Sequence, residues 1–386
     1  GGLRDYDSIG HTYDALAAGH GVNVILDWAV SVDGAAKTVE LGSGAKIGYD
    51  RLVVSPGIDL KYESVNGYSI DAQDTMPHAW KSGTQVALLK SQVENMREGG
   101  TFIMVPPPNP FRCPPGPYER VSMIAHILSK KNPTAKIIVL DPKEKFSKQA
   151  LFTEGWQKHY PDMVEWIPAS VSGGVKNINM DTMEIETDIE TFKADAASVV
   201  PAQKSGAICD RAGLTDGDWC PIVPATMQSR ADENVHVLGD ASVASAMPKS
   251  GFSANSQAKV AAMAIRGALT GSKVFEPRFG NTCWSLIDAN DGVKVGANYK
   301  LDDKLSVRGG YAFLDNPVPD RTLSPAAPES KQHAFSVGFG YLIGNITIDA
   351  FYTAAFYEDN KVDNDILSGD YENFAHYLGF SSGYRF

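Results

Sequence analysis

The chain has 386 residues, of which 43% are hydrophobic and 21% charged, enough for two or three domains with cores of their own. Its formal net charge of -11 argues against nucleic acid or an anionic membrane surface as a main partner. The four cysteines are too few for a disulfide scaffold and form no Cys-x-x-Cys pair, so we expect no metal site. No run of about 18 apolar residues predicts a transmembrane helix, and the first residues do not form a signal peptide.

Short strands and turns alternate over the first sixty residues. The pattern predicts a small helix over Thr12–Ala18, a strand over Val22–Asp27, and an apolar strand over Arg51–Ser55 that runs into Pro56 and Gly57. Such a strand ending in a small residue and Pro-Gly can bring the backbone close to a bound cofactor. An ordinary strand and turn is the alternative.

A βαβ unit follows after a helix predicted over Gly83–Glu98. A strand over Thr101–Val105 leads into a turn, a helix runs over Tyr118–Lys130, and a second strand, Lys136–Leu140, ends in Asp141. This is the framework of a nucleotide-binding fold, in which the turn carries glycines and the final acid binds a ribose.

The turn of this unit, Phe111–Arg120, carries Cys113, three prolines and a single glycine where a glycine-rich turn would be expected. Just before it, Pro106–Pro108 offer no backbone N–H to a phosphate, and proline rings stiffen a turn that glycine would leave open. The turn is therefore predicted to hold a thiol and not a pyrophosphate.

An apolar strand within Asn234–Ala241 ends in Gly239-Asp240. The glycine permits close approach, and the acid can accept a hydrogen bond from a cofactor hydroxyl, although a strand end with a capping acid is the plainer interpretation. Lys249, Ser250 and Gly251 then lead into a helix of small residues that ends near Leu269, for which we expect Ser253 as the cap. The positive helix end and Lys249 would face an anionic cofactor edge; a solvated loop lysine is the alternative.

The chain resembles the flavin-binding subunit of flavocytochrome c sulfide dehydrogenase over about residues 1–295. The likeness depends on the segments Pro106–Arg120, Phe146–Gln149, Gly239-Asp240, Met247–Gln257 and Asn281–Cys283. The resemblance implies FAD as cofactor, held by Pro56, Gly57, Gly239, Asp240, Lys249, Ser250 and Gly251, and a redox-active disulfide between Cys113 and Cys283. Spacing alone favours two separate buried thiols, and Cys209 and Cys220 match no redox position of the family.

The resemblance implies a periplasmic oxidoreductase. Hydrosulfide attacks one sulfur of the Cys113–Cys283 disulfide and gives a persulfide and a free thiolate, which Arg112 or the flavin's surroundings could keep ionised. The electrons pass to FAD and then to a c-type cytochrome subunit, with no nicotinamide. The family also begins with a strand, a Gly-x-Gly-x-x-Gly turn and a flavin-linking cysteine; none lies ahead of Gly1, so we expect an N-terminally truncated chain.

The last quarter has a different pattern. Alternating strands are expected over Lys304–Phe313, His333–Leu342, Ile346–Tyr357 and Phe374–Phe386, and this aromatic-rich alternation is typical of outer-membrane barrels. Residues 296–386 resemble the end of the outer-membrane long-chain fatty-acid transporter family, through Asn316–Asp320 and Tyr384–Phe386. A soluble β-domain packed on the flavoprotein is the alternative.

The expected fold is α/β, with two dinucleotide-binding-like domains of the glutathione-reductase type, the first incomplete, and an antiparallel β segment of the outer-membrane-barrel type. The expected divisions are 1–66 with 203–272 (FAD-binding), 67–202 (nucleotide-like, without an NAD site), 273–295 (a cap with the second redox cysteine) and 296–386 (the β segment). Two other functions stay open. One is a sulfide:quinone oxidoreductase-like enzyme, which would be expected to carry a membrane-seeking helix pair that this chain lacks. The other is a non-functional chimera or transporter fragment, in which the outer membrane is a partner only if the tail is genuine.

Overall fold

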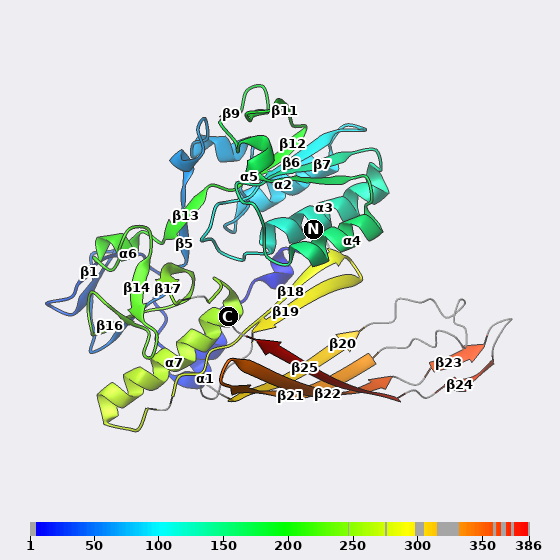
Figure 1. Ribbon diagram of the computed structural model, residues 1–386. Coiled ribbons are helices and arrows are strands. Elements are labelled where there is room, and N and C mark those ends of the chain that lie inside the picture. The colour runs from blue at the N-terminus through cyan, green and yellow to red at the C-terminus, as the bar shows by residue number, and fades with distance from the viewer. Residues whose placement is uncertain are drawn as a thin grey trace. The chain divides into compact units, whose positions relative to one another are not determined.

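The computed structural model describes residues 5–245, 247–274, 276–297, 305–314, 332–357, 360–363, 368–371 and 374–384. The chain divides into two compact units, Gly1–Val295 and Gly296–Phe386 (Figure 1). No helix of the described residues is long and apolar enough to cross a membrane.

A four-stranded parallel sheet forms the centre of the first unit's nucleotide-like part. Its strands lie in the order β12 (Ala196–Val199), β6 (Thr101–Val105), β7 (Lys136–Leu140) and β8 (Val164–Ile167). The predicted βαβ unit is thus confirmed, with α3 (Gly116–Lys131) as its crossover helix.

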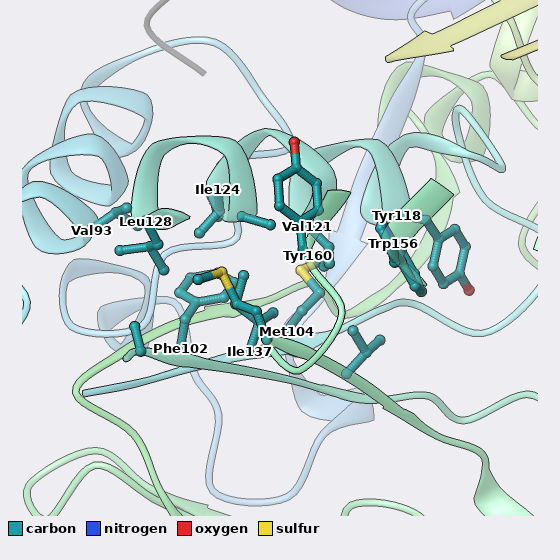
Figure 2. Packing of buried hydrophobic residues seen from close by; sticks show 14 of the residues in the cluster. Val93, Phe102, Met104, Tyr118, Val121, Ile124, Leu128, Ile137, Trp156 and Tyr160 are labelled. Carbon is teal, nitrogen blue, oxygen red and sulfur yellow. The ribbon is translucent and has the colours of Figure 1, made fainter. Parts of the chain in front are cut away.

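One face of this sheet packs against α3 and its neighbours α2 (Thr84–Glu94) and α4 (Gln149–His159). Figure 2 shows Phe102, Met104 and Ile137 beneath the helical side chains of this core. Successive strand side chains point to opposite faces, so Ile103 and Val105 belong to a second core on the other face.

A three-stranded antiparallel meander contributes to this second core. Its strands are β9 (Asn177–Asn179), β10 (Glu184–Glu186) and β11 (Thr191–Lys193). Each gives one buried residue, Ile178, Ile185 and Phe192, and the short α5 (Ala169–Ser172) precedes them.

The other part of the first unit is built on a mixed five-stranded sheet. Its order is β17 (Ser242–Val243), β14 (Cys220–Val223), β15 (Gln228–Ser229), β16 (Val235–Val237) and β4 (Leu52–Val54). The two strands that the sequence singled out, β4 and β16, are parallel neighbours, so Pro56-Gly57 and Gly239-Asp240 leave the sheet at the same edge.

Smaller elements complete the first unit. They are η1 (Asp7–Ile9), α1 (Asp14–His20), β1 (Ala29–Asp33), β2 (Thr38–Leu41), β3 (Lys46–Gly48), β5 (Ile58–Lys61), η2 (Tyr62–Ser64), η3 (Asp71–Asp74), β13 (Ala202–Ser205), α6 (Ile208–Arg211), η4 (Gly239–Ala241) and α7 (Gly251–Thr270). The strand expected over Val22–Asp27 is wrong. No described strand pairs with this segment, and its Leu26 is 90% exposed.

The segment after α7 folds back as β18 (Asn281–Asp288) and β19 (Asp291–Ala297). It is fixed to the helical layer by Ile287, which is buried in the core formed by α3 and α4. A Cβ on Gly155 would lie 2.5 Å from Ile287 Cγ2, so only glycine leaves room for this side chain.

The second unit is an antiparallel sheet in the order β20 (Leu305–Leu314), β21 (Gln332–Ile343), β22 (Ile346–Tyr357) and β25 (Phe374–Tyr384). A separate pair is formed by β23 (Asn360–Asp363) and β24 (Ser368–Tyr371). The expected strands are confirmed to within a few residues, whereas Asn316–Asp320, Arg385 and Phe386 lie outside the described residues.

Candidate functional site

Cys113 lies in the turn that joins β6 to α3, in a left-handed backbone conformation with φ of 57°. Its N–H donates to the carbonyl of Lys249 over 2.8 Å, and its own carbonyl accepts from Gly116 N–H over 2.7 Å. Left-handed backbone is costly for a residue with a side chain and persists only where its surroundings fix it. The surroundings here are the next two prolines and the loop before α7.

The Cys113 sulfur lies over the first turn of α3. A Cβ on Gly116 would lie 3.1 Å from Cys113 Sγ and 2.9 Å from Trp80 Cη2, so the glycine makes room for both groups. Backbone N–H groups at a helix start favour a thiolate.

Cys283 is brought to the same helix by β18. Lys148 Nζ donates to the carbonyl of Cys283 over 2.9 Å and to Ser285 Oγ over 3.0 Å. One residue further on, Leu286 N–H donates to Glu119 Oε1 over 2.8 Å, which connects β18 to the first turn of α3.

Cys113 and Cys283 are both free thiols in this structure, and both are partly exposed. Burial raises the pKa of the Cys113 thiol from its ordinary value of 9.0 to about 11, with further contributions from the nearby Cys283 and Glu119. The two sulfurs are therefore close enough to interact electrostatically, and in the dithiol state Cys113 carries its proton at neutral pH.

The start of β18 is also hydrogen-bonded to the start of α7. Ser250 Oγ donates to Asn281 Oδ1 over 2.6 Å, and Ser253 Oγ does so over 3.3 Å. The predicted cap was wrong by one turn: Ser250 is the N-cap of α7, and its hydroxyl accepts from Ser253 N–H over 3.1 Å. Ser253 itself is buried in the helix.

Asp240 is paired with Arg112, the residue before Cys113. Arg112 Nε donates to Asp240 Oδ2 over 2.7 Å, so the expectation that Arg112 stabilises the thiolate finds no support in this geometry. The guanidinium also lies over Gly57, which has φ of +73° and where a Cβ would be 2.7 Å from Arg112 Nη2. Arg112 thus contacts both glycine-containing turns, one at Gly57 and the other through Asp240, next to Gly239.

Lys249 is half-buried, and its ammonium group is hydrogen-bonded within the protein. Its Nζ donates to the carbonyls of Asp240 (2.6 Å) and Ser242 (3.0 Å), and it lies 3.6 Å from the centroid of the Trp219 ring. Burial lowers the pKa of Lys249 to about 8, with Asp240 acting in the opposite direction. Its place is structural, supporting the loop whose carbonyl holds Cys113. Gly251, next to the cap, is exposed.

Arg120 is the last residue of the Phe111–Arg120 turn, and the sequence predicts no individual role for it. Its guanidinium donates to the carbonyls of His78 (2.7 Å) and Ala79 (2.5 Å) and to Ser198 Oγ (2.8 Å), and it lies over the Trp80 ring. Burial lowers the pKa of Arg120 to about 10, and the Cys113 thiolate acts against that shift. No carboxylate among the described residues pairs with it.

Two buried donors beside Arg112 have no hydrogen-bond partner among the described residues: Trp80 Nε1 and Gln203 Nε2. Gln203 Oε1 accepts from Arg112 N–H over 2.8 Å, which fixes the amide. Unpaired buried donors are costly unless a ligand satisfies them, and the pyrimidine edge of a flavin is rich in acceptors. These residues, with Gly57 and Gly239, fit the isoalloxazine end of FAD.

The acid that ends the βαβ unit, Asp141, is bound by side chains of the protein itself. Asp141 is 1% exposed, pairs with Lys143 Nζ at 2.7 Å and accepts from Tyr118 OH (2.6 Å) and Trp166 Nε1 (3.0 Å). The side chain that would bind a nucleotide ribose in this fold is used internally.

The architecture of the first unit is the two-domain flavoprotein fold that the sequence predicted. Similar solved structures are the sulfide:quinone oxidoreductase from the hyperthermophilic bacterium Aquifex aeolicus (TM-score 0.57, 19% identity, 71% of this chain and 67% of that chain), and the ferredoxin reductase for the CYP199A2 system from Rhodopseudomonas palustris (TM-score 0.55, 15% identity, 86% and 74%). The covalent putidaredoxin reductase–putidaredoxin complex is similar as well (TM-score 0.54, 15% identity, 89% and 76%).

Two family models match separate segments. Residues 86–201 match "Sulfide dehydrogenase (flavocytochrome c) flavoprotein chain, central", and residues 290–386 match "Outer membrane protein transport protein (OMPP1/FadL/TodX)". Both resemblances inferred from the sequence are confirmed on these segments, the first over part of residues 1–295 and the second over the whole of residues 296–386.

Proposed function

We propose that residues 1–295 oxidise hydrosulfide through a Cys113–Cys283 disulfide and pass the electrons to FAD. The observation that carries the proposal is that β18, held against α3 by Glu119 and Lys148, brings Cys283 to the turn that contains Cys113. The match of residues 86–201 to the flavoprotein chain of sulfide dehydrogenase supports it.

The two sulfurs differ in their surroundings, and this assigns their roles. Cys113 lies over the start of α3 and follows Arg112, which is bound to Asp240, whereas Cys283 lies beside the exposed Trp284. Hydrosulfide then attacks Cys283 Sγ, an S–S bond breaks as a new one forms, and Cys283 becomes a persulfide while Cys113 leaves as a thiolate.

The buried charge of Arg120 stabilises this thiolate. Within the described part of the chain the hydrogen-bond partners of Arg120 are all neutral, and its positive charge is balanced there only when Cys113 ionises. The N–H of Gly116 is directed at the same turn. The Gly116 N–H lowers the pKa of Cys113, against the burial that raises it.

FAD would be held at its flavin end by the backbone at Pro56-Gly57 and Gly239 and by the unpaired donors of Trp80 and Gln203. When bound, FAD supplies a two-electron acceptor for the thiolate and a one-electron donor to the next carrier. Asp240, Lys249, Ser250 and Gly251 shape the surrounding loops, because the first three are hydrogen-bonded to other parts of the site and Gly251 begins α7.

We expect a c-type cytochrome as the electron acceptor, in line with the family of residues 86–201, and no nicotinamide. The internal use of Asp141 and the cysteine-proline turn support the second expectation. The sulfide:quinone oxidoreductase likeness concerns the fold, and a quinone acceptor is an outcome that the experiment below can detect.

Residues 296–386 are proposed to be an outer-membrane segment, which would place the flavoprotein part in the periplasm. One face of β21 carries a row of exposed apolar side chains: Phe335, Val337, Phe339, Tyr341 and Ile343. Their cross-strand neighbours include Tyr352 and Ile348, and such a face suits contact with lipid.

The test uses the purified full chain, loaded with FAD and kept anaerobic. Hydrosulfide is expected to bleach the flavin absorption, and NADH is not. Cytochrome c and a short-chain quinone are then offered separately to the reduced protein, and cytochrome reduction is expected to be the faster. A chain that binds FAD but is bleached only by NADH would overturn the proposal, and a chain that takes up no FAD would do the same.

A further inference from the structure

The buried imidazole of His78 has no part in the chemistry proposed above. The side chain is 3% exposed and lies in the segment between η3 and α2. Its Nδ1 accepts from Trp80 N–H over 3.0 Å, so the proton of the neutral ring is on Nε2. Nε2 then donates to Gln73 Oε1 over 3.2 Å and lies 3.3 Å from Tyr62 OH. The tautomer of the ring is therefore fixed by neighbours on both sides.

The environment of His78 keeps this ring neutral. Burial lowers the pKa of His78 to about 4, and the charges of Arg120 and Lys81 act in the same direction. At neutral pH its Nδ1 is therefore an acceptor, as the hydrogen bond from Trp80 N–H requires.

The three residues His78–Trp80 hold both arginines of the Cys113 turn. The first two carbonyls accept from Arg120, and the third accepts from Arg112 Nη1 over 3.4 Å. Ser198 Oγ, which also accepts from Arg120, donates to the first of these carbonyls over 3.4 Å. The position of this short segment therefore decides where the two guanidinium groups lie.

The Trp80 ring connects the same segment to the sulfur. Gly116 and Arg120 are four residues apart on α3 and therefore share one face of the helix. The guanidinium carbon of Arg120 lies 4.8 Å from the centroid of the Trp80 ring. A Cβ on Gly116 would lie 2.9 Å from Trp80 Cη2 and 3.1 Å from Cys113 Sγ. The indole thus contacts the buried charge and also borders the surroundings of the thiol.

The conformation of this segment depends on side-chain acceptors. Ala79 has φ of 43°, a left-handed conformation that is costly for a residue with a side chain and persists where its surroundings fix it. Ala79 N–H donates to Gln85 Oε1 over 2.9 Å, and Trp80 N–H donates to the imidazole of His78. These two acceptors take the place of the backbone partners that a helix or strand would supply.

We propose that His78 is a positioning residue of the sulfide oxidation proposed above, on which this inference rests. Its Nδ1 fixes the turn of residues 78–80, and the carbonyls of that turn keep the charge of Arg120 beside Cys113. His78 acts through Trp80 and Arg120, and not through a proton of its own. A histidine with a purely structural role would contribute to stability and leave the thiolate unaffected.

The experiment compares His78→Asn with His78→Gln in the full, reduced chain that carries Cys283→Ser. An Asn side chain can accept from the backbone N–H two residues further on, as Nδ1 does here, whereas the longer Gln places its amide near the position of Nε2. The rate of Cys113 alkylation by iodoacetamide at neutral pH is followed by mass spectrometry. Tyr68→Phe is the control, since it removes a buried 2.7 Å hydrogen bond to the Met76 carbonyl and leaves the contacts of His78 in place.

His78→Gln is expected to slow the alkylation of Cys113 by up to about tenfold, the effect of one unit of pKa increase, whereas His78→Asn and the control should stay within about twofold of the parent rate. With Arg120→Gln already present, His78→Gln should slow the reaction no further. His78→Leu also lacks the acceptor and replaces His78→Gln if that variant does not fold.

Equal rates for the Asn and Gln variants would overturn the inference. Faster alkylation in the Gln variant would do the same, because a turn that is only loosened admits the reagent more readily. The measurement uses neither FAD nor hydrosulfide, so its outcome is separate from that of the flavin-bleaching test. Slowed alkylation in a chain that fails to oxidise hydrosulfide would refute the proposed function and leave the effect of His78 on Cys113 standing.

Discussion

The N–H of Cys113 donates a 2.8 Å hydrogen bond to the carbonyl of Lys249, and this contact joins the two halves of the flavoprotein fold at the candidate site. The turn before α3 and the loop before α7 come from different sheets. The Lys249 carbonyl fixes a cysteine in a left-handed backbone conformation, while the Lys249 ammonium holds the carbonyl of Asp240. The thiol is therefore positioned by the same loop that shapes the flavin side.

The pair of Arg112 and Asp240 is expected to stabilise this junction. The side chains are 33% and 15% exposed, so the pair is only partly screened by water. In a double-mutant cycle with Arg112→Met and Asp240→Asn, the coupling free energy is expected to be about 0.5–3 kcal/mol. Urea unfolding of the four proteins measures it. A coupling that cannot be told from zero would contradict this role.

Gly155, which leaves room for the Ile287 side chain, is expected to control whether Cys283 reaches Cys113. Gly155→Ala places a methyl group 2.5 Å from Ile287 Cγ2 and should displace β18. Overpacking of this kind typically costs about 1–3 kcal/mol, and the formation of the Cys113–Cys283 disulfide should slow in parallel. Gly19→Ala is the matched control, since nothing lies within 4 Å of its Cβ position in α1. Equal effects of the two changes would refute the docking account.

The reduced protein is expected to depend on pH through Cys113. Its pKa in the folded state is about 11, above the ordinary 9.0, so the folded chain holds the proton more tightly than the unfolded chain between these values. The stability that this thiol contributes is therefore fully present below about pH 9 and is lost as the pH rises toward 11. The rate of Cys113 alkylation by iodoacetamide should rise over the same interval. A midpoint near that of a free thiol would show the burial effect to be wrong.

Arg120 is expected to act on Cys113 through its charge. In a Cys283→Ser background, Arg120→Gln removes the cation but keeps a donor for the carbonyls of His78 and Ala79, and should raise the pKa of Cys113. Each unit of increase lowers the thiolate fraction, and with it the alkylation rate at neutral pH, about tenfold. Arg120→Lys keeps the charge and should restore most of the rate. If Lys and Gln lower the rate equally, Arg120 is only a packing residue.

The sequence predicted those features whose cause is local. The strand, helix and strand around Cys113 follow from apolar runs and turn residues, and so do the strands that run into Pro56-Gly57 and Gly239-Asp240. The parallel pairing of these last two strands, β4 and β16, depends on the tertiary fold. The strand expected over Val22–Asp27 failed because a strand also needs a neighbour, which no local pattern reports.

The contacts that define the candidate site could not be predicted from local sequence patterns. Spacing alone favoured separate thiols for Cys113 and Cys283, and both are free thiols in this structure. What holds β18, the strand that carries Cys283, against the helices is the packing of Ile287 against Gly155, two residues with no motif around them. The partner of Arg112 likewise proved to be Asp240, a choice set by the tertiary fold. Arg120 was visible in the motif, but its role depends on neutral partners from two distant segments.

The most direct test of the central claim follows the bonds of Cys113 and Cys283 through the reaction with hydrosulfide. This first step does not involve the flavin. Air-oxidised full chain is alkylated and mapped before and after hydrosulfide is added. The account predicts Cys113 linked to Cys283 before, and afterwards a Cys283 peptide heavier by one sulfur atom beside a free Cys113. Two unlinked cysteines in the oxidised protein, or no added sulfur on either, would contradict it.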